Sequence, residues 1–288
     1  MNGVDTTQNA HAYDGVVVTP PKDYPPTTSP LWTGWMTLSL FGIVVAMVLV
    51  VLLTPPHERL WAWLGTMLLF ACFSAVVGYG GTGLWRGLLI DERNRVSLTR
   101  LQFILWTIVV LSGYLIAAVS NIRAGVSTPL AITIPEHLWV LMGISTTSFI
   151  ASPLIRSTKT RRAADPAEVE RTKAQLARQL GVATVDGHVD TQGQLLVSPT
   201  PKAARWVDVF MGEETGNGAH LDLAKVQMFY VTLISVLIYA VTLGMTFNAT
   251  SEAITTLPPL GASMVTLLAM SHTGYLTHKA MPLSQTPQ

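Results

Sequence analysis

Two sets of polar residues at matched spacing are the residues of this chain best placed to do chemistry. Each set holds a basic residue, a threonine and a tyrosine separated by seven positions, which puts three side chains on one helix face. One positive charge followed by two hydroxyl groups suits a polar path or a ligand cleft. The sets are Arg100, Thr107 and Tyr114, and Lys225, Thr232 and Tyr239.

Two interpretations of these sets stay open. In the first, they form a polar seam that lines a path or cleft between two helical units. In the second, the hydroxyl groups bond between helices, while Arg100 and Lys225 extend toward lipid headgroups. Gln102 and Gln227 lie elsewhere on their helices, and we expect them to bond to a neighbouring helix or to loop backbone.

A later pair of apolar segments carries further polar residues. Ser145 lies in the earlier segment, and Ser271, His272 and Tyr275 lie in the later one, where they are candidates for interhelical bonding or docking. An ionisable group inside a membrane is a functional-site hypothesis by default. His272 is only six residues from His278, however, so a position near the membrane interface stays open.

The chain lacks the common catalytic and metal-binding motifs. No HExxH, paired CxxC, GxSxG or Walker sequence occurs, and Cys72 is the only cysteine. We therefore expect a non-enzymatic protein with no metal and no cofactor. Five carboxylates lie beside basic residues, where they predict local salt bridges at the membrane surface. They are Asp91, Glu92, Glu213, Glu214 and Asp222.

The two polar sets belong to a duplicated segment. Residues 97–114 recur as residues 222–239, at an offset of 125 positions that also aligns Gln102 with Gln227. The similarity continues at an offset of 126, which aligns Ser145 with Ser271. Each unit reads as a polar foot, a helix, a loop with proline and a second helix. Two like units in parallel order suggest a pseudo-two-fold axis along a membrane normal.

Composition places the chain in a lipid bilayer. Of its 288 residues, 49% are hydrophobic and only 12% charged, with a mean hydropathy of +0.41, whereas soluble domains carry about 25% charged residues. Its apolar runs approach the roughly 20 residues that span a membrane. We predict an all-α, polytopic membrane protein with six transmembrane helices. The predicted spans are residues 31–53, 60–79, 101–119, 137–154, 228–247 and 260–275.

Charge predicts the orientation of these spans. With six spans and a cytoplasmic N-terminus, 16 Lys and Arg residues fall on the cytoplasmic side, and only Arg59 and Arg123 fall outside. This bias is typical of cytoplasmic loops. Both termini are then cytoplasmic. The net charge of +1 gives no reason to expect a nucleic acid partner.

The predicted spans divide the chain into six segments. These are a disordered tail (1–30), an N-terminal hairpin (31–79), repeat unit 1 (80–154), a cytoplasmic insert (155–219), repeat unit 2 (220–279) and a C-terminal tail (280–288).

The insert carries its own structural signals. Asp165 as N-cap, Pro166 and Glu168 predict the start of a helix that stops at Gly181. Residues 182–197 favour a short hairpin, and residues 204–211 a helix lying on the membrane surface.

The motifs around both feet resemble those of a group of uncharacterised bacterial inner-membrane proteins. Residues 90–102 fit their pattern IDxRNxxSLxRxQ, residues 216–227 fit GNxxxLDLxKxQ, and residues 270–279 fit MSxxxYLxxK. A fourth pattern, GISxxxY, corresponds to residues 143–149, where Phe149 departs from it by replacing the tyrosine. The resemblance implies a multi-pass protein of the bacterial inner membrane and implies nothing about activity.

The sequence features are consistent with two functions. The leading hypothesis is a self-associating, non-enzymatic membrane scaffold or anchor that docks a soluble protein at its cytoplasmic face, because the polar patterning concentrates there. The alternative is a small oligomeric channel or transporter that uses the polar seam. Against this alternative, the middles of the predicted spans contain no Asp, Glu, Lys or Arg.

Overall fold

The computed structural model describes residues 32–185, 189–249 and 252–284, and it is 68% helical. The disordered tail predicted for residues 1–30 lies outside the described residues. The helices are α1 (Gly34–Leu53), α2 (Arg59–Thr82), α3 (Leu98–Arg123), α4 (Glu136–Thr160), α5 (Pro166–Leu180), α6 (Leu223–Ala249) and α7 (Ala262–Ala280). The strands are β1 (Asp190–Gln192) and β2 (Leu195–Val197), and short 3-10 turns are η1 (Pro56–Glu58), η2 (Gly87–Leu89), η3 (Pro201–Ala203) and η4 (Trp206–Val209).

Five of the described helices are long and apolar enough to cross a membrane: α1, α2 extended by η1, α3, α4 and α6. The chain is therefore an all-α protein of the multi-pass membrane type. The sixth predicted span exists as a helix, α7, with 19 residues. Its composition sets it apart, because Ser271, His272 and Thr273 interrupt the apolar run and His278 and Lys279 close it.

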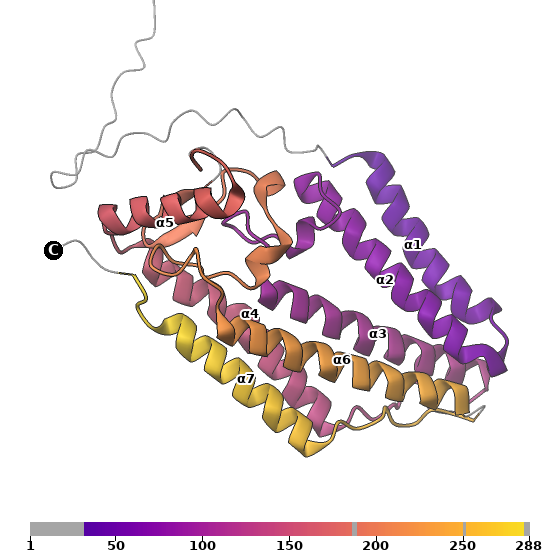
Figure 1. The fold of residues 1–288 in the computed structure, drawn as a ribbon. Coiled ribbons are helices and arrows are strands. Elements are labelled where there is room, and N and C mark those ends of the chain that lie inside the picture. The colour runs from indigo at the N-terminus through magenta and orange to yellow at the C-terminus, as the bar shows by residue number, and fades with distance from the viewer. Residues whose placement is uncertain (1–31, 186–188, 250–251, 285–288) are drawn as a thin grey trace, which may run out of the picture.

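Four helices form the centre of the molecule. In Figure 1, α3, α4, α6 and α7 run side by side, and the α1–α2 hairpin packs against them through α2. Within this bundle α3 contacts α4 and α6, and α7 contacts the same two helices. Gly113 permits the close approach of α3 to α6, because a Cβ atom there would lie 3.1 Å from Cδ1 of Leu243.

Aromatic residues fill the bundle where α2, α3 and α6 meet. Trp63 of α2 is 3% exposed, and its indole nitrogen donates to the hydroxyl of Ser112 at 3.0 Å. The rings of Trp106 and Tyr239 lie 6.0 Å apart. By contrast α1 buries only Met47 and Val51, as expected for a helix whose remaining surface meets lipid.

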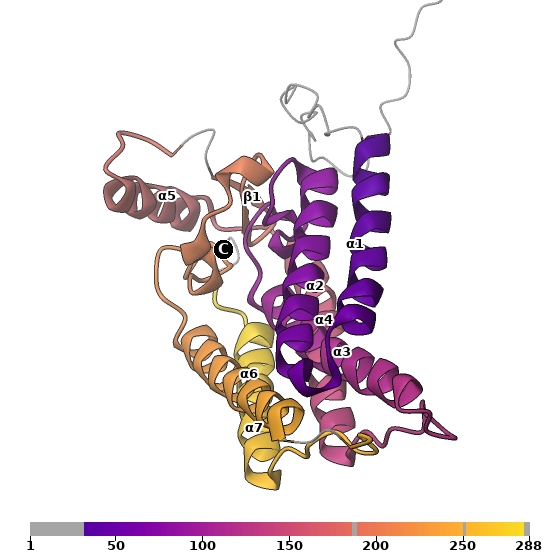
Figure 2. The ribbon, with the colours of Figure 1, turned by 90° about the vertical axis from the view of Figure 1, so that its right-hand side faces the viewer.

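The described part of residues 161–222, hereafter the cap, covers one end of the bundle (Figure 2). Its helix α5 begins as predicted: the carboxylate of Asp165 accepts from the backbone nitrogens of Ala167 and Glu168. The helix ends at Gly181 in a left-handed conformation, φ +67°. The predicted hairpin is also confirmed, with β1 and β2 joined at Gly193.

The surface helix predicted for residues 204–211 is wrong. This segment forms only η4, and its apolar side chains divide between two directions. Trp206 and Val207 are exposed, whereas Val209 is buried and Phe210 packs edge-on against Phe229. The reason is Asp208, whose buried carboxylate accepts from Arg95 and so draws the chain toward the helix ends.

Candidate functional site

A buried cluster of charged side chains joins the cap to the ends of the helices. It draws on separate stretches: the α2–α3 connection, the last turn of α4, the cap, the first turn of α6 and the last turn of α7. Its charged members are Asp91, Arg93, Arg95, Arg156, Lys159, Asp208, Glu213, Glu214, Lys225 and Lys279. We call this set the junction cluster.

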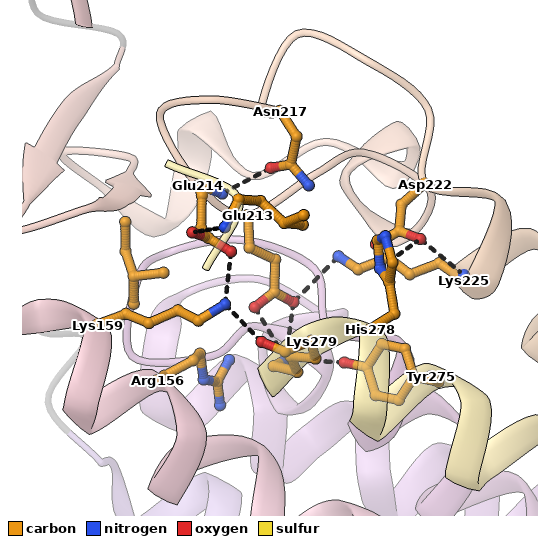
Figure 3. Close-up of a pocket in the computed structure, with 12 residues that line it drawn as sticks. Arg156, Lys159, Glu213, Glu214, Asn217, Asp222, Lys225, Tyr275, His278 and Lys279 are labelled. Carbon is orange, nitrogen blue, oxygen red and sulfur yellow. Dashed lines mark hydrogen bonds and ion pairs between the residues drawn. The ribbon is translucent and has the colours of Figure 1, made fainter. Parts of the chain in front are cut away.

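Glu213 of the cap lies at the centre of the junction cluster (Figure 3). Its carboxylate is 2.8 Å from Nζ of Lys279, 3.0 Å from Nζ of Lys225 and 3.3 Å from Nη1 of Arg93. The three cations come from α7, α6 and the α2–α3 connection. One carboxylate of the cap therefore contacts both proposed repeat units.

Asp91 forms a second centre, in the α2–α3 connection. Its side chain is fully buried and pairs with Arg93 at 2.7 Å and also with Arg156 of α4. A tight turn holds it there, because the backbone nitrogen of Asn94 bonds to the carbonyl of Asp91. Asn94 has φ +57°, a left-handed conformation that asparagine adopts more readily than most residues.

Lys159 and Glu214 connect α4 to the cap and to the end of α7. The Lys159 ammonium lies 2.5 Å from Glu214 and also donates to the backbone carbonyls of Lys279 and Met281. Glu214 in turn accepts from the backbone nitrogens of Leu283 and Ser284. A cation beside the last carbonyls of a helix interacts favourably with the helix dipole.

Arg95 and Asp208 complete the junction on the other side of the cap. Their side chains, 7% and 3% exposed, approach to 3.2 Å, and Arg95 also donates to the carbonyl of Gly212. Asp208 accepts from the backbone nitrogen of Arg205 as well, which closes the η4 turn. This pair therefore positions the segment that the sequence predicted as a surface helix.

The cations of the cluster lower the pKa of two of its carboxylates, Glu213 and Asp91. Among the described residues the cluster holds six cations and four carboxylates. Burial alone would raise the pKa of Glu213, but Arg93, Lys225 and Lys279 outweigh that effect and hold its pKa well below the usual value of 4.5. Asp91 likewise has a lowered pKa, because Arg93 and Arg156 overcome its burial.

The junction cluster leaves very little free space. The cavity between Arg156, Lys159, Glu213, Lys225 and Lys279 measures about 10 Å³, close to the minimum for one water molecule. No group of three or more potential metal ligands occurs within the described residues. The arrangement acts as a clamp between the cap and the helices, with no room for a substrate.

The two predicted polar sets occupy different surroundings. Lys225 belongs to the junction cluster, and the hydroxyl of Thr232 accepts from Gln102 at 2.5 Å. The Tyr239 hydroxyl is buried with no hydrogen-bond partner among the described residues. The second set thus faces the interior of the bundle.

The first set lies nearer the surface. Arg100 pairs with the exposed Glu92 at 2.7 Å, Thr107 donates to the carbonyl of Phe103 within its own helix, and Tyr114 reaches the carbonyl of Leu130 at 3.4 Å. The structure therefore does not bring the six residues into one shared seam. Gln102, rather than a member of the first set, makes the polar contact to α6, through Thr232 and the carbonyl of Met228.

The remaining candidate residues for interhelical bonding or docking also divide into buried and exposed side chains. His272 shares a 2.6 Å hydrogen bond with Ser148 of α4. Tyr275 lies 3.4 Å from Ser152 and accepts from Lys279 at 2.8 Å. Ser145 and Ser271 are buried, whereas Gln227 is exposed.

Sequence reasoning missed how the cluster converges. It assigned Asp91, Glu213 and Glu214 to surface salt bridges, yet their side chains are at most 13% exposed. It attached no role to Arg93, Arg156 or Lys159. One sequence feature could have predicted the cluster. These charges lie directly beside the apolar runs, where a folded cap is able to bury them.

Comparison of the chain with protein family models, with curated proteins and with solved structures returned no significant match.

Replacing Glu213 with Gln is expected to loosen the cap. The change leaves three buried cations without their shared carboxylate, and breaking a buried pair costs about 3–5 kcal/mol. Glu92→Gln is the matched control, because Glu92 pairs with Arg100 and Arg156 with its side chain 62% exposed, where such pairs contribute about 0–1 kcal/mol. Trypsin cleavage at the exposed Arg171 and Arg178 of α5 measures the effect in detergent. Equal cleavage rates in the two variants would contradict the central role of Glu213.

Acid is expected to weaken the same junction. A carboxylate whose pKa is lowered by folding stabilises the protein above its unfolded pKa and loses that contribution as the pH falls through its folded pKa. For Glu213 and Asp91 the loss begins below about pH 4.5 and 3.8, their ordinary values. The thermal midpoint, followed by tryptophan fluorescence, should be flat from pH 7 to 5 and then fall. In Glu213→Gln the fall should be smaller, and an unchanged profile would argue against this assignment.

Proposed function

We propose that this protein is a non-enzymatic integral membrane scaffold or anchor that binds a soluble protein partner at the face formed by its cap. The observation that carries the proposal is the junction cluster, which fastens a folded cap to helix ends from both units. A cap held in this way presents a preformed surface to a partner. Preformed surfaces bind with a smaller ordering cost than flexible loops.

A sixth membrane crossing by α7 belongs to this proposal. The helix has 19 residues, so it extends about 28 Å, close to the roughly 30 Å of the hydrocarbon core. Its last turn lies in the junction cluster beside the end of α4 and the start of α6. Its side packs against both helices. These contacts support a helix that runs the full height of the bundle.

Contacts between two loops at the end of the bundle opposite the cap support the internal repeat. Thr133, in the α3–α4 loop, forms a parallel bridge to Thr256, in the α6–α7 loop. Its backbone nitrogen bonds to the carbonyl of Thr255, and its carbonyl accepts from Leu257. Two hairpins that both start and end at the junction cluster and join at their loops fit a duplicated unit.

We place the protein in the bacterial inner membrane with its cap in the cytoplasm, as the charge bias favours. Self-association through the apolar surface of α1 and α2 is part of the same proposal. Where lipid does not cover that surface, a second copy of the chain is a suitable occupant.

The proposed docking surface lies between α5 and η4. A cavity of about 150 Å³ opens there, lined mainly by apolar residues, with Arg95, Arg205 and Asp208 among its polar members. Leu180, Val182, Trp206 and Val207 nearby in the cap are 39–55% exposed. This chemistry suits a partner that presents an apolar side chain next to a carboxylate, the latter facing Arg205.

Site-specific photocrosslinking in native membranes tests the docking proposal. A photoreactive phenylalanine analogue at Val182, on the cap, is expected to give a discrete protein adduct. The same phenylalanine analogue placed at Leu237, an exposed apolar position of α6, is the lipid-facing control. It should give no protein adduct. Adding Arg205→Glu to the Val182 protein should remove the adduct, because a carboxylate there repels the expected partner charge. Identical adducts with and without Arg205→Glu, or none at Val182, would refute the proposed surface.

A channel or transporter remains the second candidate, and one observation favours it. Five buried side-chain atoms within α3, α6 and α7 have no hydrogen-bond partner among the described residues: Gln102 Oε1, Trp106 Nε1, Tyr239 OH, Ser271 Oγ and His272 Nε2. Unpaired buried polar atoms are rare and require an explanation, of which bound water is the usual one. Water between the helices would provide the start of a polar path.

Proton flux into liposomes tests this second candidate. A conducting bundle should acidify the lumen after an external acid pulse, as reported by a trapped pH-sensitive dye. His272→Asn should slow the flux at least tenfold, because Asn can keep the bond to Ser148 but lacks the Nε2 atom. Silent liposomes, or equal flux from both proteins, would remove this candidate.

A further inference from the structure

An apolar groove lies between α2 and α3, in the half of the bundle nearer the cap. Its volume is about 240 Å³, and Leu88 of η2 also lines it. The lining residues are half-buried, so the groove is open to the surroundings of the bundle. Its apolar walls are formed by Phe70, Phe73 and Val77 of α2 and by Phe103, Ile104 and Ile108 of α3.

The two polar side chains of the groove bond within their own helices. The hydroxyl of Thr107 donates to the carbonyl of Phe103 at 2.7 Å, and that of Ser74 donates to the carbonyl of Phe70 at 2.9 Å. A bound water needs two to four polar partners, and these walls provide only two hydroxyl groups whose protons are already donated. Apolar cavities of about 150 Å³ stay dry and take up apolar molecules. The groove therefore suits an apolar occupant.

The cap end of the groove lies at the level of the lipid headgroups. On α2, Tyr79 follows Val77 by two residues and stacks on the exposed Trp85, with 4.8 Å between ring centroids. Such aromatic residues gather at membrane interfaces. On α3, Arg100 precedes Ile104 by one turn, and its side chain is 26% exposed. Arginine at the end of a membrane helix extends toward the headgroups, so the groove runs from that level into the hydrocarbon.

The dimensions of the groove suit one hydrocarbon chain. From Phe70 to Val77 the α2 wall extends about 10 Å, which lies within one leaflet of a hydrocarbon core roughly 30 Å thick. A helix with its side chains is about 10–12 Å across, so a helix of a second copy would cover the groove without filling it. Atoms beside a void lose their packing contacts. An acyl chain from the surrounding bilayer restores them.

We propose that this groove binds one acyl chain of a membrane phospholipid, whose headgroup lies beside Arg100. The site is separate from the docking surface of the cap and does not depend on the proposed function. It gives a role to two members of the first polar set, Arg100 at the headgroup and Thr107 in the wall. The bound chain packs against both α2 and α3 and so fastens the N-terminal hairpin to the bundle.

A photoreactive lipid tests this site on the full chain. The probe is a phosphatidylglycerol with a diazirine in one acyl chain, mixed into liposomes that contain the purified protein. After irradiation, mass spectrometry of the peptides locates the adducts. We expect the adducts to concentrate on residues 70–77 and 103–108. Tyr230 and Ile234, exposed positions near the cap end of α6, report ordinary contact with the bilayer and should be labelled less.

Substitutions that fill the groove assign the adducts to it. Thr107→Phe and Ser74→Phe each place a large apolar side chain in one wall, and each should lower the groove adducts to the level at Ile234. Thr266→Phe is the matched control, because Thr266 is exposed on α7 and makes the same bond, to the carbonyl of Ala262 four residues earlier. This control should leave the groove adducts unchanged.

A photoreactive phenylalanine analogue at Ile108 gives a second reading in the same liposomes. We expect it to crosslink to lipid. Any of three results would contradict the lipid site. They are equal labelling of the groove and of Ile234, unchanged groove adducts in folded Thr107→Phe and Ser74→Phe, and crosslinks from position 108 to a second copy of the chain.

Discussion

The junction of cap and bundle depends on one buried carboxylate, that of Glu213. Three cations from three different stretches converge on it, so the positions of the α2–α3 connection, α6 and α7 become mutually dependent. Such a cluster is weak evidence for stability, because removing charges from water costs several kcal/mol per ion. We infer that its main contribution is to the specificity of the fold. Lys225 and Lys279 meet this carboxylate only when the cap is seated, whereas Arg93 also pairs with Asp91 of its own connection.

The cost of burying charge also explains why packing stabilises the middle of the molecule and charge pairing is found at its ends. The middle of the bundle relies on packing of Trp106, Tyr239 and Leu243 and on a few polar contacts such as Trp63 to Ser112. Charges gather at the two ends, since placing them at the centre of a bilayer is costly. At the cap end, the chain brings its own carboxylates to its cations.

At the cap end, the junction cluster limits what a partner protein can reach. Because its charged side chains are buried, the junction cluster leaves only the outer surface of the cap for a partner.

The polar residues within the bundle show that sequence spacing predicts a helix face but not the helix against which that face packs. Spacing by seven correctly places Lys225, Thr232 and Tyr239 on one face of α6. The same spacing on α3 says nothing about which neighbour that face meets. Helix packing turned the face of Gln102 toward Thr232 and left Thr107 beside an apolar groove against α2. A half-turn of one helix decides between a shared seam and two unrelated stripes.

Much of the fold was determined by the sequence alone, because its signals are local. Long apolar runs specify helices in a membrane, and Asp165, Pro166 and Gly181 specify both ends of α5 through their own backbone preferences. Only the tertiary structure decided that Asp91, Arg93, Arg156, Glu213 and Lys279 meet. Their distances depend on how the helices pack and how the cap folds back, and neither depends on nearby residues alone. The prediction of a surface helix at residues 204–211 was wrong for this reason. Its apolar pattern is local, whereas the hydrogen bond that Arg95 donates to Asp208 spans 113 positions.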